Sequence, residues 1–244
     1  TWEVLEGIVK HNGPMMLDDK NKSAAKEIYE FDKKFNLQLD TYAGAEAQVA
    51  ALADDIAYNN HDIDDGIRAG LFSMNDLFDI PGIGEIIKTV KSNFPKTDET
   101  RQRHEIVRNL VGIMVTDCLT ESRSRLKQSH PSSADDIRLL DHPIVSFSKK
   151  IYELDRCLKD FLYEKMYRHF RVNRMTSKAR RVIIGLFQQL LSEPENLPTK
   201  WQEKISGESE LQKAQVIADY IAGMTDRFAY GEHSRIVDLR PLTI

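Results

Sequence analysis

Hydrophobic residues recur at intervals of three and four along most of this chain, and alternation with a period of two is almost absent. Such spacing places apolar side chains on one face of a helix, so the sequence predicts an all-α protein. Turn and capping residues separate the segments. The predicted helices are Trp2–His11, Ala24–Phe35, Ala43–Arg68, Asn75–Phe78, Ile83–Asn93, Thr100–Gln128, Ala134–Leu139, Lys149–His169, Lys178–Leu191 and Leu211–His233.

The longest predicted helix with a continuous apolar stripe is Thr100–Gln128, which we expect to act as a central strut. Its stripe consists of Ile106, Leu110, Ile113, Met114 and Leu126. No change in composition marks a domain boundary, and the best candidate for a joint is Ser129–Ser133. The chain therefore forms either one domain or two, covering residues 1–128 and 129–244.

The segment Ala45–Gly70 divides into two opposite stripes when it is drawn as one helix. Its apolar stripe contains Ala45, Val49, Leu52, Ile56, Ile63 and Ile67, and its polar stripe contains Asp54, Tyr58, His61, Asp62 and Asp65. An acidic stripe is usually the solvated side of an amphipathic helix. Three carboxylates, a phenol and an imidazole on one side also suit a divalent cation and the hydroxyls of a sugar phosphate.

Composition limits the remaining classes of function. The net charge of −4, from 34 basic and 38 acidic residues, argues against attraction of the whole molecule to nucleic acid or anionic membranes. Cys118 and Cys157 are the only cysteines, which excludes a disulfide framework or a cysteine-based zinc site and favours a reducing cytoplasm. No apolar run reaches the roughly 18 residues of a transmembrane helix, so we expect a soluble cytoplasmic protein.

The polar stripe lies within AEAQVAALADDIAYNNHDIDDGIRAG, which closely resembles one helix of the deoxyguanosine triphosphate triphosphohydrolase family, a branch of the HD-domain phosphohydrolases. WEVLEGIVKHNGP, RHEIVRNLVGIMVTD, MYRHFRVNRM and YIAGMTDRFAYGEH resemble further segments of that family in the same order. The resemblance implies an all-α, HD-domain-like bundle that commonly forms homo-oligomers. It also implies hydrolysis of deoxynucleoside triphosphates to deoxynucleoside and tripolyphosphate, with a divalent metal ion such as Mg²⁺ or Mn²⁺ held by a His, a His-Asp dipeptide and a distant Asp.

By this resemblance, Asp54 is the distant metal ligand. Tyr58 matches the residue that packs against or bonds the deoxyribose, and Asp62 matches a carboxylate that orients sugar or phosphate. The alternative, that the His61-Asp62 pair is itself the metal dipeptide with His11 as the first ligand, is disfavoured because the surrounding residues resemble the helix of the last ligand. We expect His11 to be a satisfied polar residue near a helix end.

No segment of this chain resembles the family's first His or its metal-binding His-Asp dipeptide. Thr1 opens directly into the amphipathic run WEVLEGIVKH, which suggests a fragment. One carboxylate and water bind a cation weakly. We therefore expect this chain alone to be inactive and to need the N-terminal portion of the same protein.

Two basic groups are candidates for binding phosphates. Arg101 and His104, with neighbouring cations near the start of a long helix, are placed to contact triphosphate oxygens, although such residues are commonly solvated. The segment Lys165–Arg181 combines cations with interleaved aromatics, a pattern that suits a single-stranded DNA or nucleotide effector. A surface that pairs with the chain's own acidic residues explains the second group equally well.

Three interpretations of function remain open. The first is a metal-dependent deoxynucleoside triphosphate triphosphohydrolase, present here in part. The second is a helical module for effector binding or oligomerisation without catalysis. The third is an HD phosphohydrolase that acts on another phosphate ester, which release of orthophosphate in place of tripolyphosphate would identify.

Overall fold

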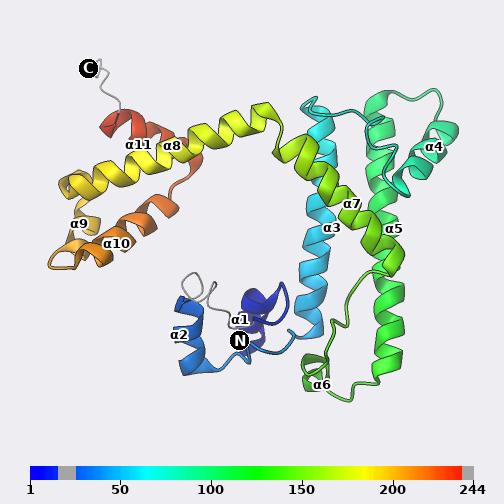
Figure 1. Ribbon diagram of the computed structural model, residues 1–244, viewed down its shortest axis with the longest axis horizontal. Coiled ribbons are helices and arrows are strands. Elements are labelled where there is room, and N and C mark those ends of the chain that lie inside the picture. The colour runs from blue at the N-terminus through cyan, green and yellow to red at the C-terminus, as the bar shows by residue number, and fades with distance from the viewer. Residues whose placement is uncertain (16–25, 238–244) are drawn as a thin grey trace. The chain divides into compact units, whose positions relative to one another are not determined.

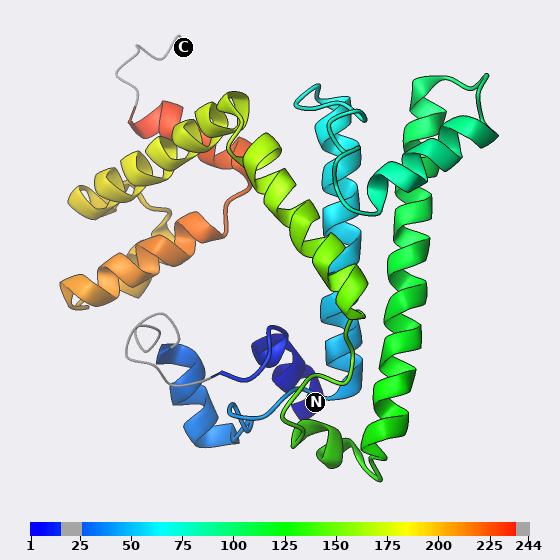
Figure 2. The same cartoon turned by 45° about the vertical axis from the view of Figure 1, so that its right-hand side comes forward.

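The computed structural model describes residues 1–15 and 26–237. Every regular element within these two ranges is a helix, which confirms the all-α prediction. The chain divides into two compact units, Thr1–Tyr167 and Arg168–Ile244, each with its own hydrophobic core. The ribbon can be followed through each unit in Figures 1 and 2.

The first unit is built around three helices: α3, α5 and α7. Its elements are α1 (Trp2–Lys10), α2 (Lys26–Phe35), α3 (Ala45–Arg68), α4 (Ile83–Asn93), α5 (Glu99–Ser129), α6 (Ala134–Arg138), α7 (Lys149–Leu162) and the π-helix η1 (Tyr163–Tyr167). Helices α3 and α5 run side by side, and α7 packs against α3 (Figures 1 and 2). Burial of apolar side chains at these contacts supplies the main stabilisation of the unit.

The core of the first unit joins residues that are far apart in the sequence. Ile63 of α3, Leu110 of α5 and Leu158 of α7 are all at most 1% exposed and belong to one cluster. The segment after residue 128 thus contributes to the same core as the segment before it. The domain boundary that we expected there lies inside the first unit, whose last residue is Tyr167.

The second unit packs the four α-helices that the structure describes in it around a smaller core. It contains α8 (Phe170–Ser192), a short 3₁₀ turn η2 (Pro194–Asn196), α9 (Thr199–Ile205), α10 (Glu210–Ala222) and α11 (Asp226–Ile236). The buried residues of α8 are Val182, Leu186 and Leu190, all in its C-terminal half. The N-terminal half of α8, from Phe170 to Arg181, is therefore almost entirely exposed.

Most predicted helices are present, and the exceptions have local causes. Residues 75–78 form turns because the Asp76 carboxylate accepts hydrogen bonds from the backbone N–H and hydroxyl of Ser73. The helix predicted through His169 ends earlier, and the His169 ring accepts from the N–H of Arg171 to cap α8. Residues 24 and 25 of a predicted helix lie outside the described ranges.

The last predicted helix is two helices in the structure. Helix α10 ends at Ala222 with Gly223 as its C-cap, and Thr225 caps the start of α11 by accepting a hydrogen bond from the N–H of Phe228. Helix α9, which follows Pro198, was not predicted. In the described part of the chain, no helix is both long and apolar enough to cross a membrane.

Candidate functional site

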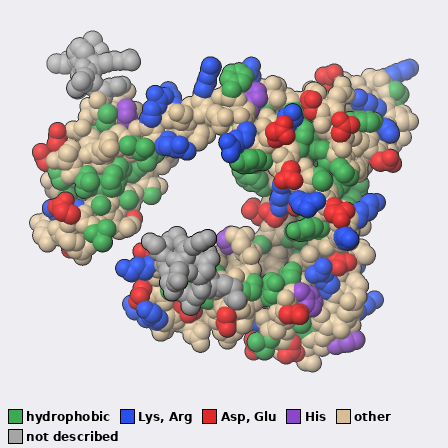
Figure 3. Space-filling model, in the orientation of Figure 1, with side chains coloured by type: hydrophobic (Ala, Val, Ile, Leu, Met, Phe, Trp, Pro, Cys, Tyr) green, Lys and Arg blue, Asp and Glu red, His purple; other side chains and the backbone are tan. Residues whose placement is uncertain are grey.

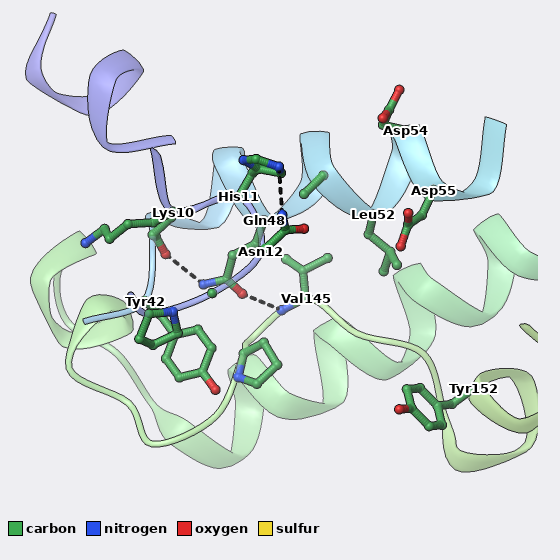
Figure 4. Close-up of a pocket in the computed structure, with 15 residues that line it drawn as sticks. Lys10, His11, Asn12, Tyr42, Gln48, Leu52, Asp54, Asp55, Val145 and Tyr152 are labelled. Atoms are coloured by element: carbon green, nitrogen blue, oxygen red, sulfur yellow. Dashed lines mark hydrogen bonds between the residues drawn. The ribbon is translucent and has the colours of Figure 1, made fainter. Parts of the chain in front are cut away.

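A cavity of about 660 Å³ lies beside the N-terminal half of α3. Its walls come from the end of α1 and the loop after it, from α3, from the loop before α7, and from α7 itself (Figure 4). The residues that line it include Lys10, His11, Tyr42, Gln48, Leu52, Asp54, Asp55, Val145 and Tyr152. Helix α3 thus contributes two consecutive acidic residues, Asp54 and Asp55, to the lining of one cavity.

Asp54 stands at the edge of this cavity, and its carboxylate points outward from α3, away from Gln48 and Val145 (Figure 4). It also borders a groove of about 510 Å³ between α1 and α3, where Val4 and Ile8 are 57% and 65% exposed. No hydrogen bond or ion pair joins Asp54 to another residue in the described part of the chain. The carboxylate is therefore available to bind a ligand where the cavity and the groove adjoin.

Gln48 fixes the start of α3 next to the cavity. Its amide Nε2 donates to the carbonyl of Ala43 at 2.7 Å, and its Oε1 accepts from the N–H groups of Ile144 and Val145 at 2.9 and 3.1 Å. One side chain thereby ties the first turn of α3 to the loop before α7 (Figure 4). These hydrogen bonds fix the position of α3 relative to the loop before α7, which form two walls of the cavity.

A network of buried charges lies beneath the cavity. Glu6 and Lys10 of α1 are each 1% exposed and form an ion pair at 2.9 Å. The Arg138 guanidinium of α6 donates to both carboxylate oxygens of Glu6, at 2.9 and 3.0 Å. The Lys10 ammonium also donates to the carbonyl of Gln38 and the hydroxyl of Thr41. Buried charges that are fully hydrogen-bonded in this way fix the geometry of the elements that carry them.

The pKa values of this network follow from burial and pairing. Burial alone would raise the pKa of Glu6, but hydrogen bonds from Arg138 and Lys10 keep that pKa below its ordinary value. Burial lowers the pKa of Lys10, and the Glu6 carboxylate opposes this effect. Lys10 is the only Lys or Arg among the described residues that line the cavity, and its charge is already paired with the Glu6 carboxylate.

His11 uses both ring nitrogens within its own loop. Nδ1 lies 2.8 Å from the carbonyl oxygen of Ile8, and Nε2 lies 2.9 Å from the amide nitrogen of Asn12. A ring that donates through Nδ1 and accepts through Nε2 has no lone pair left for a metal ion. This geometry agrees with the expectation that His11 is a satisfied polar residue.

A second recess, of about 410 Å³, lies farther along α3 and opens between α3 and the end of α7. Tyr58, which is 57% exposed, lines it together with Tyr163 and Tyr167. The Tyr167 hydroxyl donates a hydrogen bond to Oδ2 of Asp62. The structure thus groups Tyr58 with Asp62 through a third residue, Tyr167, which sequence reasoning had placed only among the aromatics of the basic segment.

The polar and apolar stripes of α3 are only partly as predicted. Ile56 and Ile63 are buried, but Val49, on the same stripe, is 52% exposed. Asn59 and Asn60 are buried although neither belongs to the apolar stripe, and Asn59 donates to Asp155 of α7 at 2.9 Å. The spacing of hydrophobic residues gave no sign of this polar contact between helices.

Arg101 and His104 lie in the first turns of α5 and are both exposed. Neither lines the cavity or the groove at Asp54, nor the recess at Tyr58. Their neighbour Arg103 instead pairs with Asp64 near the C-terminal end of α3, at 2.6 Å. At 1.5 Å per residue, Asp64 is roughly 15 Å along the helix axis from Asp54.

Sequence comparisons connect this geometry to known proteins. The chain is 49% identical over 240 residues to a deoxyguanosinetriphosphate triphosphohydrolase-like protein of Parvibaculum lavamentivorans, a match that spans 98% of this chain and 61% of the relative. A protein of the same description from Caulobacter vibrioides is 51% identical over 239 residues, with 98% and 60% covered. The chain is a homologue of these deoxyguanosinetriphosphate triphosphohydrolase-like proteins.

The resemblance noted in the sequence is therefore confirmed along nearly the whole chain. A relative from Cereibacter sphaeroides is 40% identical over 237 residues, covering 97% of this chain and 61% of its own length. Residues 145–235 also match a family described as a phosphohydrolase-associated domain. The chain spans about 60% of the length of the curated relatives that it matches.

The residues described here do not by themselves form a metal site. Residues 1–15 and 26–237 contain no group of three or more His, Cys, Asp or Glu side chains that could hold a metal ion. Asp54 alone offers too few donors, because a divalent cation normally takes several ligands from protein or substrate. A divalent ion bound at Asp54 would therefore need further donors besides this carboxylate.

Proposed function

We propose that the whole protein is a metal-dependent deoxynucleoside triphosphate triphosphohydrolase that releases the deoxynucleoside and tripolyphosphate. The observation that carries this proposal is Asp54, an exposed and unpaired carboxylate at the edge of two hollows in a homologue of deoxyguanosinetriphosphate triphosphohydrolase-like proteins. The same helix continues toward the recess at Tyr58. Helix α3 would therefore face the substrate along its middle, from Asp54 to Asp62.

The proposed roles follow the order of residues on α3. Asp54 would supply one oxygen ligand to a divalent ion such as Mg²⁺ or Mn²⁺, whose other protein ligands lie outside the described residues. Tyr58 would pack against the deoxyribose, and Asp62 would orient sugar or phosphate. Their i, i+4, i+8 spacing keeps the three on one side of the helix. Tyr167 donates a hydrogen bond to Asp62 and lines one recess together with Tyr58.

The chemistry divides between the ion and this chain. When bound, a divalent ion neutralises phosphate oxygens and lowers the energy of the charge that develops during hydrolysis. The residues of this chain bind and orient the substrate. Asp54 would hold the ion that contacts the phosphates, and Tyr58 and Asp62 would hold the sugar. We retain Arg101 and His104 as proposed phosphate contacts that require substrate or further protein to approach the start of α5.

The test is an analysis of the products formed by the whole protein from dGTP and the other deoxynucleoside triphosphates in the presence of Mg²⁺ or Mn²⁺. Phosphorus NMR distinguishes tripolyphosphate from pyrophosphate and orthophosphate. Intact tripolyphosphate is the expected product. Orthophosphate alone would indicate a different phosphohydrolase, and the absence of turnover with any of the four substrates would favour a binding module.

A second candidate function rests on α8. Its N-terminal half carries exposed Arg174, Lys178 and Arg180, and the 55% exposed ring of Phe170 lies 5.2 Å from the Arg174 guanidinium. Lys and Arg side chains gather along this helix in Figure 3. Exposed cations beside an aromatic ring suit a single strand of DNA or a regulatory nucleotide.

This second function is a binding module within the segment Lys165–Arg181, either alongside hydrolysis or in place of it. Fluorescence anisotropy with a labelled single-stranded oligonucleotide, repeated over a range of salt concentrations, tests it. Binding that weakens steeply with salt supports the module. We also propose that the whole protein forms a homo-oligomer, which sedimentation with and without the oligonucleotide would measure.

A further inference from the structure

The middle of α5 exposes a surface without charge. Between Asn109 and Thr120 the only charged residue is Asp117. Its carboxylate accepts hydrogen bonds from the backbone N–H and the hydroxyl of Ser148, at 2.8 and 2.7 Å, and therefore faces the fold. The exposed residues of this stretch, which we call the uncharged face of α5, are Gly112, Ile113, Val115, Thr116, Leu119 and Thr120.

An exposed helix face normally carries charged side chains, as both ends of α5 do. The cations before and after the uncharged face are Arg101, Arg103 and Arg108, and Arg123, Arg125 and Lys127. Within the face, Ile113, Val115 and Leu119 are 42%, 41% and 51% exposed. Apolar side chains in the absence of charge are typical of the buried centre of a protein interface.

The spacing along this face matches the packing of one helix on another. Gly112, Leu119 and Leu126 lie seven residues apart, and Val115 lies between the first two at intervals of three and four. Such a repeat aligns side chains on the side of a helix that pairs with a second helix. Helix α5 runs without a break for 31 residues (Figures 1 and 2), so the line is up to about 46 Å long.

Gly112 and the groove beside it provide space for a partner. Apart from its own helix, no described atom lies within 4 Å of the position that a Cβ would take on Gly112. The described fold therefore gives no steric reason for a glycine, which destabilises a helix interior relative to alanine. A groove of about 600 Å³ adjoins it, lined by Ile113, Thr116 and Thr120 of α5 and by Ile151 of α7. The glycine lets a large side chain from outside approach α5 closely.

We propose that the uncharged face of α5 packs against the same face of a second copy of this chain, with the two helices antiparallel. Leu119 of each copy lies over Gly112 of the other, and the two-fold axis passes between Val115 and Thr116. Such a pairing is self-complementary, so one face serves both copies. It rests on the homo-oligomer proposed above and does not depend on hydrolysis.

Charges at the two ends of the uncharged face fit this arrangement. At about 100° per residue, Glu105 before the face and Arg123 and Lys127 after it lie on the same flank of α5. In the antiparallel register Glu105 comes level with residue 126 of the other copy, where it meets the opposite charges of Arg123 and Lys127. Arg108, which pairs with Glu105 at 2.6 Å, lies on the other flank from Arg123, so these two cations stay apart.

Sedimentation velocity of the whole protein over a range of concentrations tests the surface. Leu119→Glu places an unpaired carboxylate from each copy at the centre of the contact and should raise the dissociation constant of the oligomer by about a hundredfold or more. Leu139→Glu is the matched control, because Leu139 is a 74% exposed leucine of the same unit outside the uncharged face. This control should sediment as the wild-type protein does.

Cysteine cross-linking tests the register, and it decides the question if Leu119→Glu does not fold. Thr116→Cys places two thiols beside the two-fold axis, where mild oxidation should form a disulfide between copies. Arg123→Cys should form none, because its two copies would be roughly 22 Å apart along the helix axes. The wild-type protein, with Cys118 and Cys157, gives the background on a non-reducing gel.

The contrary outcomes are separable. An unchanged oligomer in a folded Leu119→Glu, or no cross-link in Thr116→Cys, would overturn the proposed surface while the homo-oligomer stands. Equal cross-linking in Arg123→Cys would overturn the antiparallel register. A monomeric wild-type protein that Leu119→Glu destabilises would show that another part of the same protein covers the face, and would overturn both the pairing and the homo-oligomer. None of these results depends on turnover, so product analysis alone decides the hydrolase proposal.

Discussion

A buried network of charges reaches the cavity through Lys10, and the exposed carboxylate of Asp54 stands at the edge of the same cavity; the two behave in opposite ways. Glu6, Lys10 and Arg138 are buried and satisfy one another with short hydrogen bonds and ion pairs. Asp54 is exposed, and it has no partner among the described residues. The charges of the buried residues pair with one another and join α1 to α6. The charge of Asp54 remains available to bind a ligand.

Residues that stabilise the fold and a residue proposed to act in catalysis therefore lie within a few helical turns of one another. A buried charge that lost its partner would be costly, so a paired network is maintained by folding itself. An exposed carboxylate without a partner adds nothing to stability that the structure shows. Substitutions should therefore affect stability in the buried network and activity at Asp54, and the predictions below test that division.

The largest effect is expected for Asp54→Ala in the whole protein. Loss of a metal-ligand carboxylate should lower the rate of dGTP hydrolysis by about a thousandfold or more, because transition-state charge is left uncompensated. The melting temperature should remain within error, since the Asp54 side chain makes no hydrogen bond or ion pair with the described residues. Asp65→Ala, on the same face of α3 but outside both hollows, is the control and should stay within a few-fold of wild type.

The next largest effect is on stability. Glu6→Gln removes the anion shared by Lys10 and Arg138. Lys10 loses its paired carboxylate, Arg138 keeps only Asp135, and the free energy of unfolding should fall by about 3–5 kcal/mol. Chemical denaturation measures this change. Glu3→Gln, an exposed neighbour on α1, should leave the denaturation midpoint where it is. An equal shift in both variants would show that burial does not distinguish the two glutamates.

A smaller effect is expected from pH. Because the pKa of Glu6 is lowered on folding, its ionisation stabilises the protein above the ordinary glutamate value of 4.5, and this stabilisation is lost as the pH falls through the lower, folded value. The free energy of unfolding should therefore fall as the pH drops below about 4.5. In Glu6→Gln, the free energy of unfolding should fall less steeply with decreasing pH. An equally steep fall would show that Glu6 is not its cause.

The smallest effect concerns the second unit. Arg174→Ala should weaken binding of a single-stranded oligonucleotide by about threefold and reduce the salt dependence by about one counter-ion. Turnover of dGTP without the oligonucleotide should not change. Anisotropy measures the binding, and an affinity equal to wild type at every salt concentration would remove Arg174 from the proposed interface.

Helical periodicity was enough to predict the all-α fold and the position of α4, and it located α3 and α5 to within two residues. It failed where side chains compete with the helical backbone, as Asp76 does in its turn with Ser73. It also failed at the division of the chain, because the residues of α7 return to the core of the first unit. Contacts between distant segments leave no periodic signal.

The candidate site was predicted unevenly for the same reason. Asp54, Tyr58 and Asp62 share one helix, so spacing and family resemblance were sufficient to select them. Tyr167 meets Asp62 across 105 residues of sequence, and the π turn that directs it toward α3 has no recognisable sequence pattern. Arg138, which grips Glu6 across 132 residues, could not be found from the sequence either.

The central claim is that the exposed carboxylate of Asp54 is a ligand of the catalytic ion. Anomalous diffraction from crystals of the whole protein grown with Mn²⁺ tests it most directly. The account predicts an anomalous peak in coordination contact with Asp54, and no peak at that position in Asp54→Ala. A manganese site elsewhere in an active enzyme, with Asp54 left in solvent, would contradict the account.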